Sequence, residues 1–79
     1  MKVQAKLYGT LSKFYDGYDQ AEGINLEVPE NTCVRDITKM VKVDEASIGI
    51  VTINGKIVKA DTAVTDGDEI KFFQPIAGG

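Results

Sequence analysis

Alternating hydrophobic and polar positions at the start of the chain predict a β-strand. Three apolar side chains in residues 2–8 point to one side while their polar neighbours point to the other: Val3, Ala5 and Leu7. Because successive side chains of a strand face opposite ways, this segment is typical of a strand with one buried face. The same alternation in residues 24–28 predicts a second strand, and Pro29 ends it because proline has no backbone amide to donate.

The residues between and after these two strands predict a loop and a helix. Gly9 breaks the first strand, residues 11–15 favour a short helical turn, and residues 16–23, rich in Gly and Asp, predict a surface loop. Thr32 is the predicted N-cap of a helix over residues 33–42. Apolar residues recur there at helical spacing, so one stripe of the helix should face the core: Val34, Ile37 and Val41.

Three further strands are predicted in the second half of the chain. Residues 48–53 and 56–58 flank Asn54-Gly55, a dipeptide that favours the type I′ turn of a β-hairpin because both residues tolerate positive φ. A second turn at residues 66–68 precedes the last predicted strand, at residues 69–74.

The order strand, strand, helix, strand, strand, strand indicates an α+β fold. Two strands, a helix that crosses one face of the sheet, and a return beside the first strand describe a β-grasp, or ubiquitin-like, domain. We therefore expect a mixed sheet of about five strands with one main helix packed across one face. The 79 residues are enough for one core but too few for two domains. We predict one domain over residues 1–74 and a flexible tail over residues 75–79.

Charge and composition argue against several classes of function. The 9 basic and 12 acidic residues give a net charge of -3, which argues against nucleic-acid binding because that requires clustered Lys and Arg. No apolar run approaches the roughly 18 to 20 residues that span a bilayer, and no leader opens the chain, so we expect no membrane association and a cytoplasmic location. The single cysteine, Cys33, excludes an internal disulfide and agrees with a reducing compartment.

The absence of histidine weakens most catalytic interpretations. Without it the chain lacks the usual general base, the partner of a Ser or Cys nucleophile and the commonest zinc ligand. We expect neither a self-sufficient enzyme nor a metal site. Cys33 is interpreted as packed and inert, and residues 66–69 as a turn, because their acidic side chains lack the spacing of a calcium loop. The aromatic residues at 14–18 are expected to pack over the sheet edge, since the aspartates beside them would repel phosphate.

Chemistry is expected at the end of the chain, which reads Pro75-Ile76-Ala77-Gly78-Gly79. Gly78 and Gly79 have no side chains, so this tail can pass through a narrow channel and bring the Gly79 carboxylate into the active site of another protein. The alternative is a frayed end without a function.

The strand before the tail indicates a binding partner. Its alternation buries Ile70 and Phe72 and leaves Phe73 facing away from the core. Large aromatic side chains contribute strongly to an interface when a partner covers them, so Phe73 is a candidate anchor. The alternative is that residues 16–23 fold over it.

Four segments of the chain together resemble one family. They are residues 7–11 (LYGTL), 51–58 (VTINGKIV), 66–70 (DGDEI) and 72–79 (FFQPIAGG). In this order they resemble the small subunit of molybdopterin synthase and its relatives, the MoaD/ThiS sulfur carriers, over nearly the whole chain. Gln74 departs from the pattern, because many relatives have a proline at this position, and the difference should loosen the tail slightly.

The resemblance implies that other proteins act on the tail. An adenylating enzyme of the ubiquitin-activating type would use ATP to activate the Gly79 carboxylate, and a sulfur donor would convert it to a thiocarboxylate. The large subunit of molybdopterin synthase would then accept the tail, and the sulfur would enter molybdopterin during molybdenum cofactor biosynthesis. Gly79 would carry the sulfur, and five residues would contact the partners: Phe73, Pro75, Ile76, Ala77 and Gly78. The chain would be a carrier that binds no cofactor itself.

Three alternatives stay open at this point. The chain could carry sulfur to a thiazole synthase for thiamine, although the long connection over residues 9–23 favours the molybdopterin branch. It could be a ubiquitin-like modifier whose Gly79 becomes joined to lysines of target proteins. It could also be a β-grasp binding module without covalent chemistry.

Overall fold

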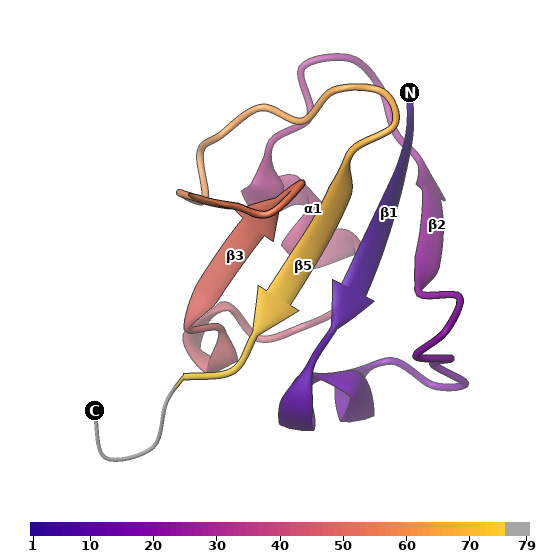
Figure 1. Cartoon of the computed structure of the whole chain (residues 1–79), viewed down its shortest axis with the longest axis vertical. Helices are drawn as coiled ribbons and strands as arrows, with labels where there is room; N and C mark the ends of the chain where they lie inside the picture. The colour runs from indigo at the N-terminus through magenta and orange to yellow at the C-terminus, as the bar shows by residue number, and fades with distance from the viewer. Residues whose placement is uncertain (76–79) are drawn as a thin grey trace.

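Five strands form one mixed sheet with the order β2-β1-β5-β3-β4, and one helix, α1 (Val34–Met40), lies behind it (Figure 1). The computed structural model describes residues 1–75. β1 and β5 run parallel, whereas the other neighbouring strands run antiparallel. The predicted α+β class and β-grasp arrangement are confirmed. The strands are β1 (Lys2–Leu7), β2 (Ile24–Glu27), β3 (Ile50–Ile53), β4 (Lys56–Val58) and β5 (Glu69–Phe73).

The core lies between the sheet and α1. The alternation predicted for the first and last strands holds, because Leu7 of β1 and Phe72 of β5 are both fully buried and lie opposite each other in the parallel pair. Val34 and Ile37 of α1 close the same cluster from the other side. One face of the sheet is therefore buried by the helix, and within residues 1–75 no α-helix covers the other, which we call the free face.

The predicted start of the helix is off by one residue. The N-cap is Cys33 and not Thr32, because the Thr32 hydroxyl donates to the carbonyl oxygen of Pro29 at 2.6 Å. The Asp36 carboxylate accepts from the Cys33 amide at 3.1 Å and lies 3.4 Å from its thiol. The helix ends at Met40, earlier than predicted, and Lys42 follows with a left-handed φ of 60°.

Short 3-10 turns shorten two of the predicted strands. The turn η1 (Gly9–Phe14) starts where Gly9 takes a φ of 63°, so β1 ends at Leu7. The turn η2 (Glu45–Ser47) precedes β3, which therefore begins at Ile50 rather than at residue 48. β2 and β5 each end one residue before the predicted boundary.

Two turns of the second half are joined by side chains. Asn54 and Gly55 have φ values of 50° and 88°, as the predicted type I′ turn requires. The buried Asp68 carboxylate accepts from the Thr65 amide at 2.7 Å and from the Asn54 side-chain amide at 3.0 Å. The hairpin and the turn at residues 65–68 are thereby held together.

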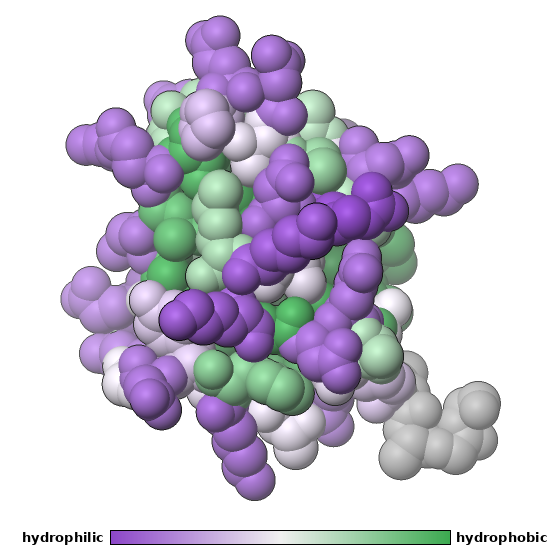
Figure 2. Space-filling view, turned by 180° about the vertical axis from the view of Figure 1, so that it is seen from behind, coloured by the Kyte–Doolittle hydropathy of each residue, from purple (hydrophilic) through white to green (hydrophobic). Residues whose placement is uncertain are grey.

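The loop over residues 16–23 packs against the edge of the sheet, as predicted. The Tyr18 hydroxyl accepts from the Leu7 amide at 2.8 Å, and both Tyr15 and Tyr18 pack against the core. Phe14 departs from the prediction, since it is 44% exposed. Seen from behind, on the helix side, hydrophilic side chains cover much of the surface and apolar patches show between them (Figure 2). Within residues 1–75 no helix has the length and apolar character needed to cross a membrane.

Candidate functional site

The structure describes only part of the predicted site. Phe73 and Pro75 lie within residues 1–75, whereas Ile76, Ala77, Gly78 and Gly79 lie outside the described residues. The part that can be built from contacts is the place where the tail leaves the domain. We call this place the tail root and define it as residues 73–75 with the side chains and backbone that touch them.

Phe73 faces away from the helix, as the alternation predicts, and its ring is half-buried. The ring stacks on that of Tyr8, with centroids 4.9 Å apart and planes 13° from parallel. Ile50, which is 40% exposed, lies opposite Phe73 in the β3–β5 pair. The side chain that partly covers Phe73 is thus Tyr8. The alternative prediction was that the loop over residues 16–23 would cover this ring, and Tyr8 lies outside that loop. Tyr8, Phe73 and Ile50 form an apolar stripe across the free face, and this stripe shares Phe73 with the tail root.

Gln74 is tied to the loop that follows β1. Its side-chain oxygen Oε1 accepts a hydrogen bond from the Thr10 amide. Gly9 makes room for this side chain, since a Cβ placed on Gly9 would come within 2.6 Å of the Gln74 Cδ. This hydrogen bond links two segments 64 residues apart. It ties Gln74 to the domain, which differs from the expectation that Gln74 loosens the tail.

Gly49 holds the other side of the tail root. Its amide donates to the Phe73 carbonyl oxygen at 2.8 Å. A Cβ placed on Gly49 would lie 2.7 Å from the Pro75 Cα, a separation that backbone atoms do not tolerate. Gly49 is therefore needed for the close approach of the chain at Pro75, a role that sequence reasoning missed because nothing near Gly49 in the sequence marks it.

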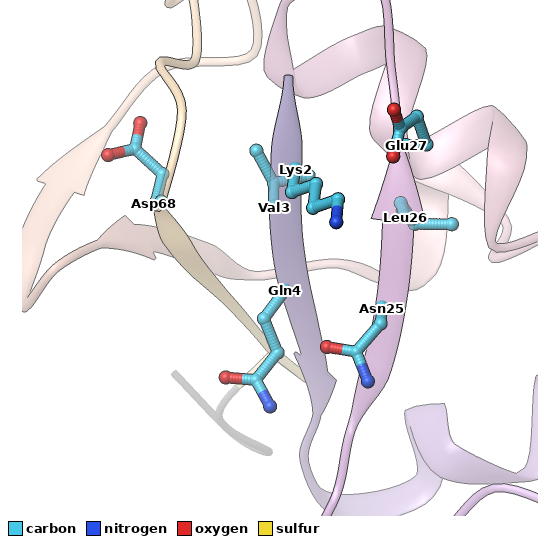
Figure 3. A pocket seen from close by; sticks show the side chains of 8 residues that line it. Lys2, Val3, Gln4, Asn25, Leu26, Glu27 and Asp68 are labelled. Carbon is cyan, nitrogen blue, oxygen red and sulfur yellow. The ribbon is translucent and has the colours of Figure 1, made fainter.

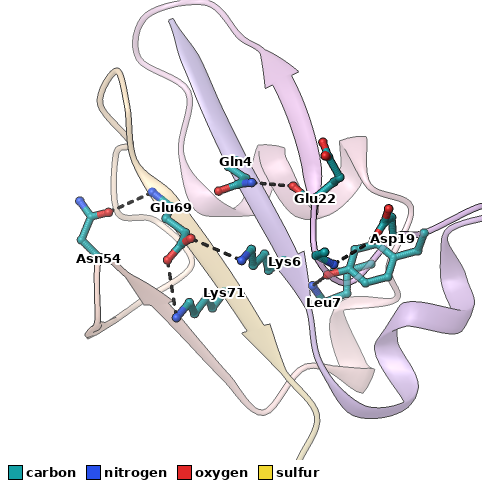
Figure 4. A network of polar contacts seen from close by, with 10 residues as sticks. Gln4, Lys6, Leu7, Asp19, Glu22, Asn54, Glu69 and Lys71 are labelled. Carbon is teal, nitrogen blue, oxygen red and sulfur yellow. Dashed lines mark hydrogen bonds and ion pairs between the residues drawn. The ribbon is translucent and has the colours of Figure 1, made fainter.

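A charged group lies on the same free face. The Glu69 carboxylate lies 3.8 Å from the Lys6 ammonium and 3.5 Å from the Lys71 ammonium (Figure 4). The Glu69 amide also donates to the Asn54 side-chain oxygen at 3.0 Å. Because Lys6 and Lys71 lie opposite each other in the β1–β5 pair, this part of the face has two cations and one anion beside the apolar stripe.

Other features of the described residues lie away from the tail root. An open hollow of about 550 Å³ crosses β1 and β2, and Lys2 and Gln4 from the first half of β1 line it (Figure 3). The Cys33 thiol is half-buried and faces Asp36 at the start of α1. The hydrogen bond from the Cys33 backbone amide lowers the pKa of Asp36, with the bond from the Cys33 thiol second. Residues 1–75 hold no group of three His, Cys, Asp or Glu side chains placed to bind a metal.

The five-stranded mixed sheet with the helix α1 packed on one face defines a ubiquitin-like β-grasp domain. The chain belongs to the ThiS family, whose model matches residues 7–79. Proteins of this family and of the similar MoaD type are small carriers without catalytic activity of their own. The predicted family and the prediction of a carrier rather than an enzyme are confirmed by this match.

Solved structures of the same fold include carriers and modifiers. A molybdopterin converting factor subunit 1 from Pyrococcus furiosus is 24% identical, with a TM-score of 0.74 over 95% of this chain and 98% of that one. Small archaeal modifier protein 1 from Haloferax volcanii is 18% identical, with a TM-score of 0.71 over 95% of this chain and 98% of that one. A complex of subunits 1 and 2 of the molybdopterin-converting factor from Helicobacter pylori matches at 18% identity and a TM-score of 0.58, with full coverage of both chains. A search of curated protein sequences gives no match.

Proposed function

We propose that this chain carries sulfur on its terminal carboxyl group for molybdopterin biosynthesis in the cytoplasm. A partner enzyme of the ubiquitin-activating type joins the Gly79 carboxylate to AMP from ATP and releases pyrophosphate. A hydrosulfide-level sulfur donor then attacks the acyl carbon, the acyl–phosphate bond breaks to release AMP, and a thiocarboxylate remains on Gly79. The chain itself needs no cofactor, because ATP is consumed by the activating partner.

The observation that carries this proposal is the place of the tail root beside the apolar stripe. A partner that covers Tyr8, Phe73 and Ile50 meets the chain where it leaves the domain at Pro75. Such a partner gains apolar contact area and access to the tail at once. Phe73, Pro75, Ile76, Ala77 and Gly78 are the residues proposed to contact it, and Gly79 is the residue proposed to react.

The molybdopterin branch has support from the fold comparisons. Subunit 1 of the Helicobacter pylori converting factor is seen in complex with subunit 2, and this chain matches that structure over its full length. We therefore propose a large synthase subunit as the acceptor partner. A ubiquitin-like modifier is the second candidate, because small archaeal modifier protein 1 shares the fold with a TM-score of 0.71, against 0.74 for the Pyrococcus furiosus protein. Transfer to a thiazole synthase is the third.

The intact mass of the protein tests the carrier proposal. Incubation with the adenylating enzyme of the same organism, ATP and a sulfur source should add about 16 mass units, since one oxygen is replaced by sulfur. The matched control is a chain with one alanine added after Gly79, which moves the carboxylate out of reach while leaving residues 1–75 unchanged. Recovery of only the free acid from the unmodified chain contradicts sulfur transfer. Higher-mass adducts with Gly79 in an isopeptide bond identify a modifier.

A further inference from the structure

The tail root is held from two sides by hydrogen bonds between residues that lie outside the hydrophobic core. On one side the Gln74 side chain accepts from the Thr10 amide, and on the other the Gly49 amide donates to the Phe73 carbonyl oxygen. Gln74 is itself exposed. A long polar side chain at an exposed position loses rotamer freedom when it is held in one place, so this contact needs a local cause.

The neighbours of Gln74 are shaped to receive it. Gly9 has a left-handed φ of 63°, and any side chain there would collide with the Gln74 amide group. Thr10 is the next residue, and its backbone amide is directed at the Gln74 Oε1 atom. Gly9 and Thr10, in the loop after β1, therefore form a binding position for the Gln74 side chain.

Pro75, the residue after Gln74, restricts the direction in which the backbone leaves the tail root. Pro75 has a fixed φ, and its ring restricts the backbone of the residue before it. Four residues follow Pro75 up to and including Gly79, and they extend at most about 14 Å. With so short a tail, the direction of the root decides which positions the Gly79 carboxylate can reach.

We propose that Gln74 is a positioning residue, which aims the tail into the active site of the adenylating partner through its hydrogen bond with Thr10. The proposal rests on the carrier function proposed above. A root held in one direction lowers the ordering cost of threading the tail, because less freedom is lost when the complex forms. Gln74 acts through the tail and does not touch the reacting atoms.

Three variants test the hydrogen bond and a fourth serves as the control. Gln74→Ala removes the acceptor, Gln74→Glu keeps an oxygen at the same place, and Gly9→Ala displaces the side chain without changing it. Gln20→Ala, at an exposed position in the loop over residues 16–23, is the matched control. Hydrogen exchange at the Thr10 amide should speed up in Gln74→Ala and Gly9→Ala but not in the other two.

The functional readout is ATP–pyrophosphate exchange with the adenylating enzyme of the same organism. We expect Gln74→Ala to raise the KM for this chain about fivefold and to leave kcat within about twofold, since the cost falls on threading. Gln74→Glu should keep the KM of the wild-type chain, because it retains an acceptor for the Thr10 amide. The double variant Gly9→Ala/Gln74→Ala should be no worse than the poorer single variant, because both break the same contact.

Distinct outcomes overturn the two proposals. An unchanged KM in Gln74→Ala, with faster exchange at the Thr10 amide, overturns the positioning role while the carrier function stands. Additive effects of Gly9→Ala and Gln74→Ala also overturn it, because they indicate that Gln74 contacts the partner directly. A wild-type chain that is never adenylated overturns the carrier function itself.

Discussion

The Phe73 ring has two roles at the residue scale, since it stacks within the domain and is open to a partner. The stack on Tyr8 stabilises the end of β5, and the exposed remainder of the ring is available for binding. A substitution at Phe73 alone mixes these two effects. The pair Tyr8 and Phe73 allows them to be separated.

We expect Phe73→Ala to weaken binding to the adenylating enzyme by ~1 to 3 kcal/mol, because a large aromatic anchor is lost. It should also lower the free energy of unfolding by about 0.5 to 1.5 kcal/mol through loss of the stack. Titration calorimetry and urea denaturation measure the two quantities. Tyr8→Ala is the control for the stack, and equal losses of affinity in the two variants would argue against Phe73 as the principal anchor.

Asp36 gives the domain a defined dependence on acid. The Cys33 amide holds the pKa of the Asp36 carboxyl below its ordinary value of 3.8. Because this pKa is lower in the folded state, the ionised Asp36 carboxylate contributes fully to folding stability above pH 3.8. This stabilisation is lost as the pH falls through the pKa that Asp36 has in the folded protein. In Asp36→Asn the drop in melting temperature between pH 5 and pH 2 should be smaller. An identical drop in both proteins would show that this carboxyl does not contribute.

Single-residue contacts of the tail root could be predicted only in part. The alternation in β5 is enough to place Phe73 on the free face. It cannot identify Tyr8 as the stacking partner or Thr10 as the donor to Gln74, because those contacts depend on the register between strands far apart in the sequence. Gly49 has no local signal at all, since its role comes from the approach of Pro75.

At the scale of elements, the carboxylate of Asp68 joins two turns. It accepts from Thr65 at the backbone amide and hydroxyl and from the side chain of Asn54. Because Asp68 is only 8% exposed, water cannot easily replace its carboxylate as the acceptor for these donors. The β3–β4 hairpin thus depends on a residue just before β5.

We predict that Asp68→Ala lowers the free energy of unfolding by about 1 to 3 kcal/mol, because the Thr65 amide loses its acceptor in a buried place. Hydrogen exchange in β4 should speed up more than exchange in β2. Asp68→Asn keeps one oxygen and should lose less. Equal exchange in β2 and β4 would show that the effect is not confined to the hairpin.

The same scale explains which boundaries were mispredicted. The Asn54-Gly55 turn has a strong local signal, because positive φ at both residues favours these two residue types. The helix start has a weak one, since Thr32 is a good N-cap by residue type but its hydroxyl is used by Pro29. Lys42 ends the helix region in a left-handed conformation without the glycine that usually marks such an end.

At the scale of the whole molecule, β5 is the element that joins the two hairpins. In the sheet, β1 of the first hairpin and β3 of the second are each hydrogen-bonded to β5, which lies between them. Leu7 and Phe72 lie opposite each other at the β1–β5 pair and are both fully buried. A defect at this pair is therefore felt on both sides of the sheet.

We expect Leu7→Ala to cost about 2 to 5 kcal/mol, because it leaves a cavity in the core. Small domains are stable by only about 5 to 15 kcal/mol, so the variant should approach the limit of folding at 37 °C. Urea denaturation followed by circular dichroism measures the loss. Lys6→Ala, on the free face of the same strand, is the control, and a comparable loss there would contradict the assignment of the core.

The fold was more predictable than the site because the two have different origins. Periodicity and turn residues along the chain determine the elements, and the order of elements restricts the sheet to few topologies. The tail root combines the ends of β1, β3 and β5, and this combination exists only once the sheet is assembled. The Gly78-Gly79 pattern indicated that the Gly79 carboxylate could enter another protein, whereas the expected sulfur chemistry came only from the resemblance to a known family.

The parallel pairing of β1 and β5 has a mechanical consequence. Met1 and the tail root lie at opposite ends of the sheet, so a force that separates the two chain ends slides β5 along β1 (Figure 1). The hydrogen bonds between these strands, and those from β5 to β3, then share the load together instead of opening one after another. A protein that pulls on the last residues should therefore meet strong resistance, because many hydrogen bonds on both sides of β5 must break at once before this central strand can leave the sheet.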